Sequence, residues 1–142
     1  MRKKRGQASI EYVILIGLLL FFLIPIVHYS FLETNNALKA SQLDSFISRL
    51  SKAVDAVHSI GPGTKEIVVV TLPKGVIESK FHNGENFGDT NEIVLKVEFY
   101  GGISDVHASV KPFLYGELPI NAGTYHLKVS SINETGVNIS IS

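Results

Sequence analysis

The chain has no cysteine among its 142 residues. This absence excludes a disulfide framework, a thiolate metal site and a cysteine nucleophile together. A basic stripe is missing as well. Four of the 13 basic residues lie at positions 2–5, and the rest of the chain carries 9 basic and 13 acidic residues, a net charge of −4. We therefore expect no nucleic-acid partner.

No combination of residues typical of an enzyme is present either. The sequence contains no phosphate-binding loop and no nucleophile elbow. Its later histidines, His58, His82, His107 and His126, are scattered. His107 and His126 could face one another across strands, but no pattern of Asp or Glu completes a metal shell around them. We expect solvent-facing histidines, no enzyme activity, no metal and no cofactor.

The chain does have a long apolar run. From Val13 to Leu32 there is no charged residue in 20 positions. A helix of that length spans about 30 Å, which is the thickness of a hydrocarbon core. The basic residues on its N-terminal side predict a cytoplasmic N-terminus and a translocated remainder. Pro25 lacks a backbone donor, so we expect it to kink or locally melt this helix.

Three kinds of segment could account for this run. A cleaved secretory signal needs a small-x-small site after the apolar core. The residues that follow, 28–34, offer none, and Leu38-Lys39-Ala40 is a poor site lying too far downstream. A plain uncleaved anchor is the second possibility. The third is cleavage before the apolar run, which leaves the helix on the mature protein.

The residues around position 6 favour the third possibility. The basic residues 2–5 and Gly6 are followed by Gln7-Ala8-Ser9-Ile10-Glu11-Tyr12. This arrangement resembles the class III signal peptides of archaeal type IV pilin-like proteins, over about a quarter of the chain. The resemblance implies cleavage by a pilin-type signal peptidase between Gly6 and Gln7. The residues that match its processing motif are Gln7, Ser9, Glu11 and Tyr12.

Glu11 is an ionisable group at the rim of an apolar helix, where it costs free energy unless it has a partner. Cleavage after Gly6 would create a positive α-amino group at Gln7. The resemblance implies that Glu11 neutralises this amine, on its own or a neighbouring subunit. Two unit charges about 4 Å apart gain about 1 kcal/mol in water and several times that in a drier core. A place in the first helical turn would further favour the anion. Alternatively, Glu11 lies solvated among lipid headgroups.

The helical period continues beyond Glu33. The polar residues 33–36 could form a turn or lie on the surface of one helix. We favour one helix, from about Ser9 to Ile60, because no Gly or Pro interrupts the chain from Val27 to Ser59, and Gly61-Pro62-Gly63 then ends it. An apolar stripe at three- and four-residue spacing predicts a buried face. Its members are Leu43, Phe46, Ile47, Leu50, Val54, Val57 and Ile60.

Strand patterns dominate after Thr64. Lys65–Leu72 reads as a buried strand, and Asn83-Gly84 predicts a two-residue hairpin turn. The pattern predicts six or seven short antiparallel strands, and with the helix an α+β fold whose head resembles a β-sandwich. The remaining strand segments are 76–81, 93–100, 106–110, 125–129 and 137–141.

Two glycosylation sequons occur near the C-terminus, Asn133-Glu134-Thr135 and Asn138-Ile139-Ser140. Asn138 falls between two apolar residues of a predicted strand, so its amide should point to solvent. An N-linked glycan at Asn133 or Asn138 is an expectation for an exported protein, although such tripeptides also arise by chance.

These features predict four segments: a cleaved leader (1–6), a transmembrane and filament-core helix (7–32), an amphipathic helical stalk (33–60) and a β-rich extracellular head (64–142). The resemblance implies a structural subunit of an archaeal adhesion pilus that polymerises with itself into a helical filament on the cell surface. Its other partners would be the membrane before assembly, the signal peptidase and the pilus assembly machinery. The alternative is a minor pilin or a membrane-anchored extracytoplasmic binding module.

Overall fold

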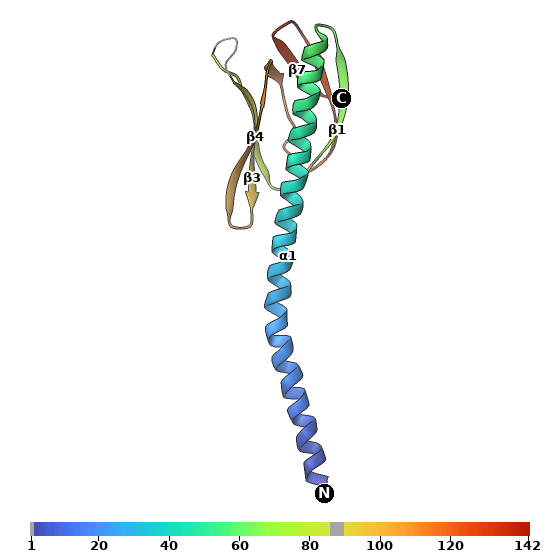
Figure 1. The fold of residues 1–142 in the computed structure, drawn as a ribbon, viewed down its shortest axis with the longest axis vertical. Coiled ribbons are helices and arrows are strands. Elements are labelled where there is room, and N and C mark those ends of the chain that lie inside the picture. The colour runs from blue at the N-terminus through green and yellow to red at the C-terminus, as the bar shows by residue number, and fades with distance from the viewer. Residues whose placement is uncertain (1, 86–89) are drawn as a thin grey trace. The chain divides into compact units, whose positions relative to one another are not determined.

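The computed structural model describes residues 2–85 and 90–142 (Figure 1). One helix, α1, runs from Arg2 to Ile60. The chain forms two compact units, residues 1–37 and Leu38–Ser142, and α1 contributes to both. The first unit is helix alone, while the second combines the end of α1 with every strand that the structure describes.

The predicted continuity of the helix is confirmed. No turn occurs at residues 33–36, where the Thr34 hydroxyl instead donates to the Ser30 carbonyl one turn earlier, at 2.8 Å. The helix is also continuous through Pro25, so the expectation of local melting there is wrong, and the kink at Pro25 stays a prediction. A proline removes one backbone hydrogen bond, and the helix continues on both sides of it despite that loss. The helix ends as predicted, with Gly61 at a φ of 112°.

Seven strands lie in the described residues and form two sheets. The first sheet has the order β1-β6-β7-β5 and the second the order β2-β3-β4. All pairs are antiparallel except β5 with β7, which is parallel. The predicted α+β fold with a sandwich-like head is therefore confirmed. The strands are β1 Lys65–Leu72, β2 Val76–His82, β3 Asn91–Phe99, β4 Gly102–Val110, β5 Phe113–Gly116, β6 Gly123–Ser131 and β7 Gly136–Ile141.

One hydrophobic core holds the second unit together. It contains the predicted stripe of α1 and one face of each sheet. Ile60 is the exception in the stripe, because it is 74% exposed at the last helical position. The strand side chains in the core alternate along each strand, as the period of a half-buried strand requires. They include Val70, Leu72, Ile93, Leu95, Val97, Val110, Leu114, Leu127, Val129, Val137 and Ile139.

The prediction that Lys65–Leu72 is a buried strand is wrong for one of the two faces of β1. Val70 and Leu72 face the core, but Ile67 and Val69 are 59% and 44% exposed. β1 is an edge strand that pairs only with β6, and nothing in the described residues covers its outer face. The run of valines therefore follows strand propensity rather than two-sided burial.

The predicted two-residue turn at Asn83-Gly84 is also wrong, since β2 ends at His82 and β3 begins only at Asn91. Asn83 instead pairs with the backbone of β5. Its Nδ2 donates to the Leu114 carbonyl at 2.8 Å, and the Leu114 amide donates to its Oδ1 at 2.9 Å. The Gly84 amide donates to Asn91 Oδ1 at 3.0 Å. Asn83 thus connects the second sheet to the edge of the first.

We expect Leu50→Ala to lower the free energy of unfolding by roughly 3 kcal/mol, because it leaves a cavity at a fully buried position of the core. The matched control is Ile60→Ala, which removes an exposed side chain from the same helix and should change stability little. Denaturant unfolding of the full chain in a mild detergent, followed by near-ultraviolet circular dichroism, measures both. An equal loss in the two variants would contradict the assigned core.

Gly116→Ala should destabilise the head by about 1 to 3 kcal/mol more than Gly101→Ala. Both glycines have φ near 100°, so both variants carry the strain of a left-handed backbone. Only at Gly116 would the new Cβ collide with a backbone carbonyl, that of Ile139 on β7. The same unfolding measurement applies, and equal losses would show that the parallel β5–β7 contact is not tight.

Candidate functional site: the exposed apolar helix

The first unit exposes its apolar side chains on every face of α1. From Ile10 to Phe31 the large apolar residues are 46% to 72% exposed. By length and composition, α1 is the one helix in the described residues that could cross a membrane. An isolated helix that is apolar all round is not stable in water, so this segment needs lipid or other helices around it.

The apolar side chains of this segment form grooves along the helix. One shallow hollow is lined only by leucines, a phenylalanine and an isoleucine at three- and four-residue spacing: Leu15, Leu18, Leu19, Phe22, Leu23 and Ile26. A second lies between residues 23 and 32. Ridges and grooves with this spacing are the surfaces through which helices pack against one another. A Cβ at Gly17 would meet nothing within 4 Å, so this position has room for close approach by another helix.

Two tyrosines mark the ends of the apolar segment. Tyr12 precedes Val13, and Tyr29 follows the apolar residues up to Val27; both side chains are exposed. Tyrosine is enriched where a membrane meets water, since its ring is apolar and its hydroxyl is polar. Tyr29 is a candidate interface residue that the distance from Tyr12 along the sequence could have indicated. Both positions are compatible with a membrane anchor formed by the apolar segment between them.

The predicted processing residues all lie on α1. Gln7, Ser9, Glu11 and Tyr12 are helical and exposed, and Gly6 has open space around it. Gln7 and Glu11 are four residues apart, which places them on one face of the helix, one turn from each other. Glu11 makes no hydrogen bond or ion pair with any residue that the structure describes. Its carboxylate is thus available to a cationic partner.

One expectation about Glu11 is wrong for the intact chain. The helix begins at Arg2, so Glu11 lies beyond its first turn, and that turn contains no acidic residue. A favourable effect of the helix dipole on Glu11 is therefore small here, because the effect falls off within the first turn. Removal of residues 1–6 would bring Glu11 to the fifth residue from the new N-terminus.

The histidines of the head do not come together within the part of the chain that the structure describes. His107 is on β4, opposite Val94, and His126 is on β6, opposite Val69. The two therefore lie in different sheets and do not face one another as strand neighbours, so that expectation is wrong. His82, His107 and His126 are exposed. His58 differs, because it is half-buried and its buried Nδ1 has no hydrogen-bond partner within the part of the chain that the structure describes.

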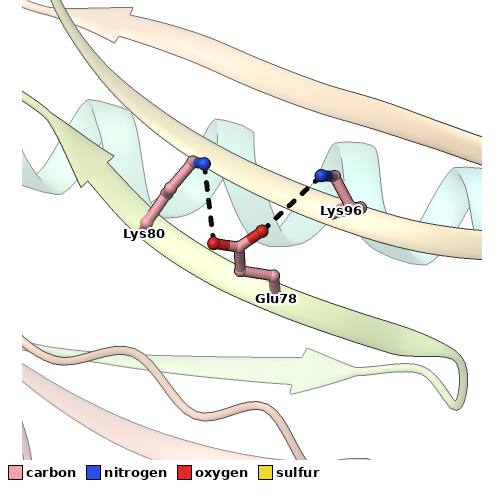
Figure 2. A network of polar contacts seen from close by, with 3 residues as sticks. All are labelled: Glu78, Lys80 and Lys96. Atoms are coloured by element: carbon pink, nitrogen blue, oxygen red, sulfur yellow. Dashed lines mark ion pairs between the residues drawn. The ribbon is translucent and has the colours of Figure 1, made fainter.

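Three charged groups of the head form a small surface network. Glu78 on β2 lies between Lys80 of the same strand and Lys96 of β3, at 3.5 Å and 3.6 Å (Figure 2). All three side chains are about half exposed, and ion pairs of this kind contribute little to stability. No group of three or more histidine, aspartate or glutamate residues in the described ranges could hold a metal ion.

A cleft of about 670 Å³ opens between β2 and β5 in the second unit. This volume is in the range of small-molecule sites. The lining is mixed, and its ionisable groups are Lys80, Tyr115 and Glu117. A mixed lining of this kind is typical of a binding surface.

The chain matches no protein-family model, no curated protein and no solved structure. Its assignment therefore depends on its own residues and geometry.

Proposed function

We propose that the chain is the precursor of a structural subunit of an archaeal type IV-like adhesion pilus. A pilin-type signal peptidase would cleave it between Gly6 and Gln7, and the mature chain would polymerise through its N-terminal helix. The observation that carries the proposal is the exposed apolar segment of α1, with the residues Gln7, Ser9, Glu11 and Tyr12 at its start. An anchor alone requires the apolar segment but not this motif.

The physical chemistry of the helix supports polymerisation. Backbone groups of α1 bond within the helix, so lipid is an adequate solvent for it before assembly. Identical helices can replace that lipid afterwards, because the grooves and ridges recur along the segment. A contact between different faces of identical subunits does not close on itself and propagates as a helical filament.

Cleavage supplies a partner for Glu11. Before cleavage the Gln7 nitrogen is a neutral peptide amide, and afterwards it is a cationic amine. The carboxylate and the amine would attract each other strongly once lipid and water are excluded around them. This pair would select one axial register among the many in which apolar helices could slide past one another.

The second unit would form the outer surface of the filament. Its net charge is negative, and it contains the cleft between β2 and β5. This surface would make the contacts with cells or materials. The same cleft favours the alternative, in which the chain is a minor pilin or a membrane-anchored binding module.

Mass spectrometry of the protein from native membranes and from the shed surface fraction should find a mature N-terminus at Gln7. The reason is the match of the cleavage motif to the residues on either side of Gly6. An intact Met1, or cleavage near Ala40, would contradict the proposal. A start at Gln7 in membranes only, without filaments in electron micrographs, would favour the anchored module.

Glu11→Ala should leave cleavage largely intact and abolish or strongly reduce filaments, because the amine of Gln7 would lack its counter-charge. Glu11→Gln, which keeps the size and removes the charge, should behave in the same way. The matched control is Glu33→Ala, which removes an exposed carboxylate beyond the apolar segment of the same helix. Electron microscopy and N-terminal sequencing of each variant provide the readouts. Normal filaments from Glu11→Gln would exclude the register role.

A further inference from the structure

The two sequons are motifs that the proposed function does not use, and the structure places them in different surroundings. Asn133 lies in the turn that joins β6 to β7, which is closed by a hydrogen bond from the Ile132 amide to the Gly136 carbonyl at 3.0 Å. Its side chain is exposed, as is that of Glu134. Asn138 lies within β7 and is half-buried.

The side chain of Asn133 is held through its oxygen. Oδ1 accepts a hydrogen bond from the Thr135 amide and another from the Thr135 hydroxyl, both at 3.0 Å. These two bonds use the acceptor of the side-chain amide and leave its donor unused. Nδ2, the atom that carries an N-linked glycan, makes no hydrogen bond to any residue in the described ranges. The first sequon therefore presents its reactive nitrogen from an exposed turn.

The second sequon is fixed by its neighbours on both sides. β7 lies between β6 and β5, and Asn138 is opposite Ser130 of one and Tyr115 of the other. The residues on either side of it, Val137 and Ile139, are fully buried. A transferase must take the acceptor segment into its own cleft, and to do so here it would have to remove β7 from two strand ladders and from the core. The fold of the head therefore makes Asn138 inaccessible to the transferase.

We propose that Asn133 is N-glycosylated and that Asn138 is not. The donor would be a lipid-linked oligosaccharide phosphate. A bond forms between Nδ2 of Asn133 and the anomeric carbon of the sugar, while the bond from that carbon to the phosphate oxygen breaks. The amide proton passes to a base of the transferase, and nothing is oxidised or reduced. The inference rests on the export of the head, which is part of the proposed function.

The test is mass spectrometry of glycopeptides from the full chain purified from its native membranes. We expect a glycan on the peptide that contains Asn133 and none on Asn138. Asn133→Gln and Thr135→Ala should lose the glycan mass completely, whereas Thr135→Ser should retain it, because serine keeps the hydroxyl that the sequon requires. The matched control is Ser140→Ala, which destroys the second sequon without changing Asn138 and should leave the glycan unchanged.

An unmodified Asn133, or a glycan on Asn138, would overturn the inference; glycans at both sites would show that modification precedes folding of β7. Export is measured separately with Ser142→Cys, because the chain has no other cysteine to react with a membrane-impermeant maleimide on intact cells. A labelled head without glycan overturns this inference and leaves the pilus proposal in place. An unlabelled head contradicts both.

Discussion

The burial of one apolar stripe of α1 is the interaction on which the second unit depends. Leu43, Phe46, Leu50, Val54 and Val57 are almost completely removed from solvent, in one cluster with side chains from both sheets. Burial of this kind is favourable by about 25 cal/mol for each Å² of apolar surface. Because the helix stripe covers one face of each sheet, only that face has to be apolar. Buried positions therefore alternate with more exposed positions along β3 and β6. The opposite faces remain free to be polar, charged or modified.

The first half of the same helix has no such cover from any residue that the structure describes. Its backbone hydrogen bonds are satisfied within the helix, which makes the segment suited to lipid, and its side chains are apolar on every face. Glu11 is the one charged group between the basic residues and Glu33. An ionised carboxylate in this setting costs free energy unless a cation pairs with it. The proposed cleavage at Gly6 would create that cation, so processing and assembly would be linked through a single ion pair.

Periodicity predicted the large elements because a long amphipathic or apolar pattern has few alternative structures. The end of α1 at Ile60, the bounds of β1 and the alternation in β3 all follow from local patterns that tertiary contacts reinforce. The wrong prediction of a turn at Asn83-Gly84 has a different cause. Asn83 has the sequence of a hairpin turn, yet its side chain pairs with Leu114, 31 residues later in the chain. A local turn preference of this kind is overridden when a distant backbone offers two hydrogen bonds.

The sequence by itself determined that this chain has a membrane-length helix, with an acidic residue near its start, and a β-rich head, because these are properties of neighbouring residues. Only the tertiary structure decided which strands are edges, that β5 pairs in parallel with β7, and that His107 and His126 lie in different sheets. It also distinguishes the two sequons, because Asn133 lies in an exposed turn whereas Asn138 lies in a strand between two others. The physical reason is that strand order depends on contacts between residues far apart in the chain, and those contacts decide which side chains an outside molecule can reach.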